Sequence, residues 1–222
     1  MDFQITQKLS IFFSFLYRYA IFLGTTAKAM FNRPFYVKEI LEQLYQIGYR
    51  SLSIVSLTGL FTGMVMAFQT GMEMSRFGAK AYIGSVVSLS IVRELGPVLT
   101  ALVVAGRVGA GITAELGSMQ VTDQIDAMRA MAVDPFKKLV VTRIIALLIM
   151  LPILVAVADF VGLLGGMLIA VTNLNVGFEL YKSTVLSALL LEDLVSGFIK
   201  PIVFSLLIST IFKLFSNACF NA

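Results

Sequence analysis

Two charged residues, Arg93 and Glu94, lie side by side inside an apolar run over residues 82–106. On an insertion scale, a charged side chain at the centre of a bilayer costs roughly 2.5–3.5 kcal/mol, so such a residue is rarely retained without a use. Neighbours on a helix do not face each other, so each charge needs a partner on another helix or a wet cavity. We expect Arg93 to hold a lipid phosphate, with Glu94 tuning that site or closing a cavity. The alternative is a structural ion pair with another helix.

A further acid, Asp159, lies within a second apolar run, over residues 144–171. It either pairs with Arg93 or lies near the outer mouth of the bundle, and the sequence leaves both open. Gly96-Pro97 directly follows the charged pair. A proline inside a helix frees the carbonyl one turn earlier and favours a kink. We therefore expect irregular backbone beside Arg93 and Glu94.

A polar stretch over residues 114–135 separates two long apolar runs. Its apolar residues recur at helical spacing, which predicts one buried stripe: Val121, Ile125, Met128 and Ala132. Asp123 and Asp126 share another face, and Arg129 continues that row. We predict a short helix near residues 115–132, lying across the end of the bundle. Because so short a helix is unstable alone, a docking partner is expected; the alternative is a linker helix with a solvated acidic face.

The residue types exclude most familiar catalysis. Histidine is absent and the one cysteine is Cys219, which leaves no histidine base, no Ser-His or Cys-His nucleophile and no usual zinc cage. No phosphate-cradling Gly-Lys-Ser/Thr loop occurs either. We therefore expect no catalytic residues, no metal site and no cofactor on this chain, so that any ATP hydrolysis belongs to another polypeptide.

The composition indicates a membrane protein. Hydrophobic residues make up 58% of the 222 residues and charged residues 14%, and the mean hydropathy is +0.91; soluble domains hold about 25% charged residues. The net charge of +4 is spread over loops beside apolar runs, which argues against nucleic acid. We predict a single domain over 1–222, with interfacial or cytoplasmic helices over 1–50 and a transmembrane bundle over 51–215.

Four apolar stretches define the predicted bundle. A span needs roughly 20 residues to cross about 30 Å of hydrocarbon, and the candidates are 51–70, 82–106, 144–171 and 197–212. Charges punctuate the stretch before the last of these, so we expect an interfacial helix leading into it. Another interfacial helix is predicted over 9–31, where Arg18 and Lys28 interrupt an apolar segment. The fold class is therefore all-α and polytopic.

Loop charges and small residues complete the arrangement. Most of the 17 Lys and Arg fall on the side of the N-terminus, which predicts a cytoplasmic N-terminus and a cytoplasmic 114–135 segment. Asp134-Pro135 is a typical helix start, with Asp at the N-cap and Pro at the first helical position. Small residues at four-residue spacing predict close helix packing, either within the chain or across a homodimer seam: Gly59 and Gly63, Ala101, Ala105 and Gly109, Gly162 and Gly166.

The segment VRELGPVLTALVVAGRVGAGITAELGSMQVTDQIDAM, followed by VDP, resembles the signature of MlaE/YrbE-type permeases. These are membrane subunits of an ABC transporter family that moves phospholipids between membranes, and the resemblance covers nearly the whole chain. It implies a homodimer, two cytoplasmic ATP-binding subunits and an MCE-domain lipid-binding protein on the other face. In that family the end helix is a coupling helix seated on the ATPase. The resemblance places these residues at or near that contact: Glu115, Asp123, Gln124, Asp126 and Ala127.

The chain departs from that family at its end. It stops at KLFSNACFNA, where family members continue into a fifth span, so the resemblance predicts either a truncated sequence or a shortened permease without the last transmembrane helix. A bacterial inner membrane and a plastid (chloroplast) envelope both fit, with the N-terminus cytoplasmic or stromal. A motor-free secondary transporter or channel remains an alternative, although the two halves show no inverted repeat. A non-transporting scaffold is the other, and it would leave the charges at membrane depth unexplained.

Overall fold

The computed structural model describes residues 36–220 together with Ser14, Tyr17 and Gly24, and it describes side chains as far as residue 210. The predicted interfacial helix over 9–31 therefore lies almost entirely outside the described residues. All regular structure in the described part is helical, which confirms the all-α prediction. The elements are α2 (Val37–Leu44), η1 (Tyr45–Tyr49), α3 (Arg50–Arg76), η2 (Lys80–Tyr82), α4 (Ile83–Ser90), η3 (Ile91–Leu95), α5 (Gly96–Val121), α6 (Gln124–Ala130), η4 (Phe136–Val141), α7 (Thr142–Thr172), α8 (Phe178–Ala188) and α9 (Leu191–Phe220).

Three continuous helical segments are long and apolar enough to cross a membrane: Val37–Arg76, Lys80–Val121 and Phe136–Thr172. They contain the first three predicted spans, which are thereby confirmed by length and composition. The fourth predicted span falls within α9, which is not among the three over the described residues and so stays a prediction. A break at Leu189, whose backbone is extended, separates α9 from α8. A helix, α8, precedes the last apolar stretch as expected, and α9 begins at Leu191, six residues before the predicted start of the fourth span near Gly197.

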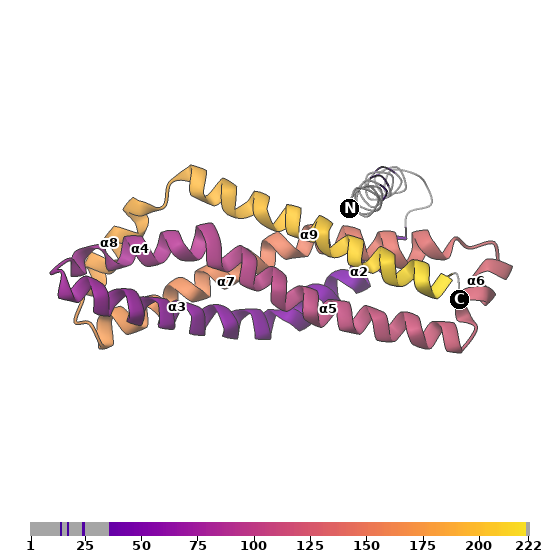
Figure 1. The fold of residues 1–222 in the computed structure, drawn as a ribbon, viewed down its shortest axis with the longest axis horizontal. Helices are drawn as coiled ribbons and strands as arrows, with labels where there is room; N and C mark the ends of the chain where they lie inside the picture. Colours follow the sequence, from indigo (N-terminus) through magenta and orange to yellow (C-terminus); the bar gives the residue numbers. More distant parts are fainter. Residues whose placement is uncertain (1–13, 15–16, 18–23, 25–35, 221–222) are drawn as a thin grey trace, which may run out of the picture.

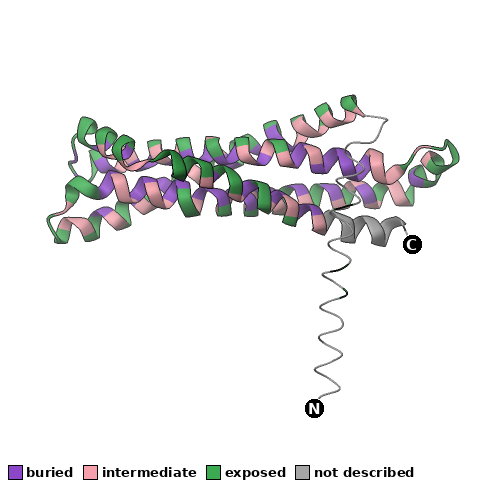
Figure 2. Cartoon of the chain, turned by 90° about the horizontal axis from the view of Figure 1, so that it is seen from above, coloured by how far each residue is buried: buried purple, intermediate pink, exposed green. Residues whose placement is uncertain are grey.

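The long helices lie alongside one another in an elongated bundle, with α8 at one end and α6 at the opposite end (Figure 1). Each long helix buries one face and leaves apolar side chains exposed on the other, as the alternation of buried and exposed residues shows (Figure 2). Leu57, Phe61 and Val65 on α3 are more than half exposed. Exposed apolar faces of this length are typical of helices that contact lipid.

Glycines allow α3 and α7 to approach closely along the middle of the bundle. A Cβ added to Gly63 would lie 1.9 Å from the carbonyl oxygen of Gly162, and one added to Gly59 would lie 2.6 Å from that of Ala158. Both distances are far below van der Waals contact, so only glycine fits at these crossings. The small residues of α3 and α7 therefore pack within the chain, as one of the two predictions held. A Cβ added to Gly109 on α5, in contrast, would meet no atom of another described element within 4 Å.

Candidate functional site

A π-helical turn, η3, carries Arg93 and Glu94 and is followed directly by Gly96-Pro97. Pro97 has no N–H, so the carbonyl one turn earlier, that of Arg93, loses its helical donor. Lys200 of α9 donates to this carbonyl from across the bundle. The predicted irregular backbone is therefore present, and the oxygen that the proline frees is capped by a cation from another helix.

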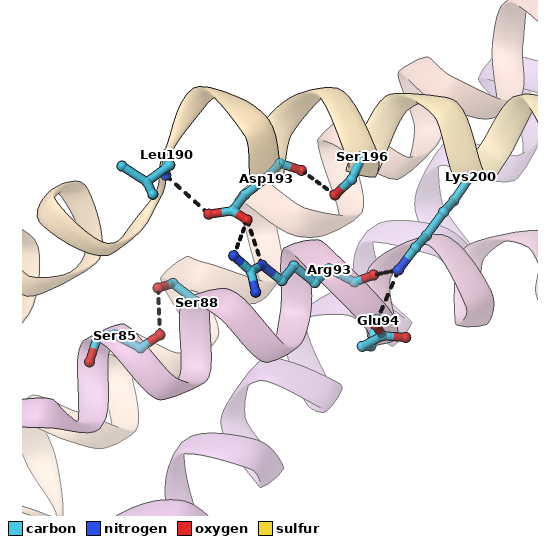
Figure 3. Close-up of polar contacts among 8 residues, drawn as sticks. All are labelled: Ser85, Ser88, Arg93, Glu94, Leu190, Asp193, Ser196 and Lys200. Carbon is cyan, nitrogen blue, oxygen red and sulfur yellow. Dashed lines mark hydrogen bonds and ion pairs between the residues drawn. The ribbon is translucent and has the colours of Figure 1, made fainter.

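Arg93 pairs with Asp193, near the start of α9. The Arg93 Nη2 and Nε atoms each lie 2.5 Å from Asp193 Oδ1, so one carboxylate oxygen accepts two guanidinium hydrogen bonds. The other oxygen, Oδ2, accepts from the backbone N–H of Leu190 at 3.1 Å. This is the acidic half of a capping box, which satisfies a free donor at the helix start. The side chain of Asp193 is 3% exposed and that of Arg93 is 50% exposed. Figure 3 shows Arg93 extending from η3 to Asp193.

Glu94 pairs with Lys200, two turns further along α9. Lys200 Nζ lies 3.1 Å from Glu94 Oε1 while also donating to the Arg93 carbonyl. We call Arg93, Glu94, Asp193 and Lys200 the η3–α9 charge network. Its two acid–base pairs hold one face of α9 against η3 (Figure 3). The structural ion pair that the sequence left open is therefore present.

Asp193 and Lys200 were not among the residues predicted for the site. The sequence carried a signal for them, because both interrupt the last apolar run and both have charges opposite to those of their partners. Sequence alone does not tell which charge on one helix meets which on another. It had offered Asp159 as a partner of Arg93, whereas the carboxylate that pairs with Arg93 is that of Asp193.

Asp159 lies elsewhere, on α7 against the backbone of η3 and α5. A Cβ added to Gly96 would lie 1.6 Å from Asp159 Oδ1, so this close contact needs glycine. Oδ1 is buried and has no hydrogen-bond partner among the described residues. Asp159 also borders a largely apolar cavity of about 290 Å³, whose wall includes Val92, Phe160 and Leu194. A buried polar atom without a partner is costly, and such sites are commonly functional or hydrated.

The end helix is present as α6, but it is shorter than predicted. It spans seven residues because Asp123 and Ala132, which flank it, both adopt positive φ, 54° and 57°. The left-handed conformation at these positions interrupts a continuous helix. Ile125 is 1% exposed and anchors α6 to the bundle, whereas Val121, predicted to share its stripe, is exposed. Asp134 caps the next helix as predicted, with Oδ1 3.0 Å from the N–H of Phe136.

Four of the five residues predicted at the end-helix contact are exposed on or beside α6: Asp123, Gln124, Asp126 and Ala127. Asp126 makes a local ion pair of 3.0 Å with Arg129, as their spacing indicated. The fifth residue, Glu115, lies on α5, where its Oε2 is 2.5 Å from Nη2 of Arg143 on α7. The side chain of Arg143 is 2% exposed. This ion pair therefore links α5 to α7, and Glu115 does not lie on α6 itself.

An all-α bundle with several membrane-spanning segments, a charge network between two helices and a short anchored helix at one end defines a polytopic integral membrane protein. A model of the family described as Permease MlaE matches residues 40–215. The chain belongs to this family of membrane permeases.

Individual relatives agree with the family match. A probable ABC transporter permease protein of Rickettsia typhi is 42% identical over 193 residues, which cover 87% of this chain and 74% of that protein. The intermembrane phospholipid transport system permease protein MlaE of Haemophilus influenzae is 36% identical, over 78% of this chain and 66% of its own length. The chloroplastic protein TRIGALACTOSYLDIACYLGLYCEROL 1 of Arabidopsis thaliana is 35% identical, over 86% of this chain and 55% of its own length.

Proposed function

We propose that this chain is the permease subunit of an ABC transporter that moves phospholipids or related lipids between membranes. Its place in the MlaE permease family, with a Haemophilus relative named for intermembrane phospholipid transport, carries the proposal. In this assignment the chain performs no catalysis, and a separate ATP-binding subunit binds and hydrolyses ATP. The membrane is a bacterial inner membrane or a chloroplast envelope, in agreement with relatives of both origins.

The end helix α6 is the proposed contact with the ATP-binding subunit. Ile125 holds it to the bundle while Asp123, Gln124 and Asp126 are exposed, and Asp126 makes a local ion pair with Arg129. A helix that is already folded, packed on the bundle on one side and polar on the other, transmits a movement of a docked partner to the bundle. Asp123, Gln124, Asp126 and Ala127 are the proposed contact residues, and Glu115 transmits the contact to α7 through Arg143.

The proposed lipid path runs along the η3–α9 charge network and Asp159. Half of the Arg93 side chain is exposed although it is paired, so its remaining N–H groups can donate to the oxygens of a phosphate. Replacing Glu94 with Arg would place a second cation beside Lys200 Nζ, which now lies 3.1 Å from Glu94 Oε1. We expect E94R to abolish lipid transfer while leaving the folded assembly intact, as judged by size-exclusion chromatography. Normal transfer by E94R would remove the network from the path.

The remaining parts of the assembly follow from the same family. We propose a homodimer of permeases, with two ATP-binding subunits on the face of α6 and an MCE-domain lipid-binding protein on the face of α8. The N-terminus then lies on the cytoplasmic or stromal side. Gly109 supports a second copy against α5, because a Cβ added to it would meet no atom of another described element within 4 Å.

ATP-dependent lipid transfer tests the function directly. The complex is purified from its own membrane, reconstituted in vesicles with fluorescent phospholipid, and assayed with ATP and without it. We expect transfer only with ATP, and native mass spectrometry should show equal copies of permease and ATP-binding subunit. An equal rate of lipid transfer with and without ATP would establish a secondary transporter or channel. Absence of transfer although all subunits are present would establish a scaffold.

A matched pair of variants tests the role of α6. Asp126→Lys reverses one charge of an exposed i,i+3 pair on α6, and Glu73→Lys does the same on α3, where Glu73 pairs with Arg76 at 3.2 Å. We expect D126K to lose the ATP-binding subunit on purification and E73K to retain it. Equal retention in both would place the ATPase contact elsewhere.

A further inference from the structure

A polar cleft of about 290 Å³ opens between η1 and α5, at the end of the bundle nearer α6. Arg50 and Arg107 line it, together with the amides of Gln43 and Gln46 and the carboxylate of Glu115. Ile47 and Ile112 form part of its wall. The cleft shares no lining residue with the cavity beside Asp159. Arg107 lies roughly 20 Å beyond Arg93 along the helical axis, at 1.5 Å rise per residue.

The cleft carries an excess of positive charge and free donors. Its one acid, Glu115, is already paired with Arg143 at 2.5 Å. Arg50 makes no ion pair or hydrogen bond with another described side chain. Arg107 uses Nη1 to donate to Ser51 Oγ at 2.5 Å, which orients the guanidinium and leaves its other N–H groups free. Two guanidinium groups with amide donors beside them suit a phosphate, because arginine forks match its oxygens.

The position of the cleft fits the depth of lipid headgroups. The 27-residue helix α3 begins at Arg50 and ends at Arg76, so its apolar part lies between two basic residues. Tyr45 and Tyr49 stack with ring centroids 5.1 Å apart, and both are more than half exposed. Exposed tyrosines beside arginine are typical of the boundary between hydrocarbon and water.

We propose that the cleft of Arg50 and Arg107 binds a phosphate group, at a site separate from the η3–α9 charge network. The guanidinium of Arg107, oriented by its hydrogen bond to Ser51, donates a pair of N–H groups to the anion. The guanidinium of Arg50, at the start of α3, contacts the same anion. The two glutamine amides donate to the remaining oxygens. A phospholipid headgroup of the adjacent leaflet and a soluble phosphate share this chemistry. Because η1 and α5 both line the cleft, an occupied site would tie the first and second spans together at this end.

Binding of defined lipids to the delipidated full-length protein in dodecyl maltoside tests the proposal by native mass spectrometry. The probes are phosphatidylglycerol, diacylglycerol, which lacks the phosphate, and inorganic phosphate as a competitor. We expect phosphatidylglycerol to bind and diacylglycerol not to bind. Competition by inorganic phosphate would show that a soluble anion is enough to occupy the site. If inorganic phosphate does not compete, the ligand of the site is the lipid headgroup. Equal binding of both lipids would overturn the proposal.

Variants locate the site. Arg50→Gln removes a charge that makes no described contact, so folding should be unaffected, and we expect an affinity for phosphatidylglycerol about tenfold weaker. Arg107→Gln should weaken binding in the same way, whereas Arg107→Lys retains the charge and should bind better than R107Q. Arg76→Gln, at the other end of α3, is the control and should bind normally. Wild-type affinity in both R50Q and R107Q would overturn the proposal. Neither nucleotide nor transport enters this measurement, so its outcome is independent of the proposed function.

Discussion

At the scale of single residues, Asp193 and Lys200 each satisfy more than one polar group on neighbouring elements. Asp193 serves two donors at once, the Arg93 guanidinium and the N–H of Leu190. Lys200 also serves two groups, the Glu94 carboxylate and the carbonyl that Pro97 leaves free. Because each of these two side chains binds two groups, its presence within the otherwise apolar sequence of α9 is explained. Removing one of them should therefore leave more than one group unsatisfied.

Asp193→Asn should destabilise the protein. The neutral amide keeps part of the helix cap but loses the charge that faces Arg93. Because Arg93 is half exposed and water can screen it, we expect a loss of about 2 kcal/mol rather than the full cost of a buried ion pair. Thermal unfolding in detergent should show a midpoint lower by roughly 5 °C. The adjacent exposed Glu192→Gln is the control and should unfold like the wild type; the same loss in both variants would argue against the pair.

Tyr181→Phe should be neutral or stabilising. The Tyr181 hydroxyl on α8 is buried and has no hydrogen-bond partner among the described residues, so the phenol gains little from its oxygen. Burial raises the pKa of Tyr181 to about 12. An unfolded chain ionises this tyrosine near pH 10, so wild-type stability contributed by the neutral phenol is lost as pH rises between about 10 and about 12. Y181F should lose less stability over that window in pH-dependent unfolding. A variant clearly less stable at neutral pH would reveal a partner for the hydroxyl.

At the scale of elements, the sequence predicts lengths well and contacts poorly. Hydropathy located the three spans, and the capping preference of Asp134 located the start of the third. Proline chemistry placed irregular backbone at η3. The partners of Arg93 and Glu94 depend on how α9 is rotated against η3, which no local pattern encodes. The end of α6 was also missed, because the helix closes with Ala132 at positive φ and the N–H of Val133 bonded to the Met128 carbonyl, a motif that usually takes glycine at this position.

Gly63→Ala should disrupt the crossing of α3 and α7. Its methyl group would meet the Gly162 carbonyl oxygen at 1.9 Å, and backbone cannot move aside as a side chain can. We expect a loss of about 3 kcal/mol, which is at the upper end for overpacking, and a midpoint lower by roughly 5–10 °C. Gly106→Ala on α5 is the control, because its added methyl group would meet no atom of another described element within 4 Å, and this variant should gain helix stability instead. Equal tolerance of both changes would contradict the close crossing.

At the scale of the whole molecule, α6 and α8 lie at opposite ends of the bundle (Figure 1), and many large apolar side chains are exposed between these ends. If the three long segments cross a membrane, these two short helices face different compartments. The excess of basic residues on the side of α6 predicts that this side is cytoplasmic or stromal. The predicted orientation can therefore be tested by measuring on which side of the membrane α6 and α8 are accessible.

Single cysteines should report this topology. Cys219 is the one cysteine of the chain, so Cys219→Ser gives a cysteine-free background. Asp126→Cys on α6 and Lys182→Cys on α8 then introduce exposed thiols at the two ends. In intact spheroplasts of an expressing bacterium, a membrane-impermeant maleimide should label K182C and spare D126C, and inside-out vesicles should show the reverse. Solubilised protein should label at both positions, which controls for thiol access. Labelling of D126C from outside would invert the orientation and separate α6 from a cytoplasmic ATPase, whereas labelling of both from one side would mean that the bundle does not span the membrane.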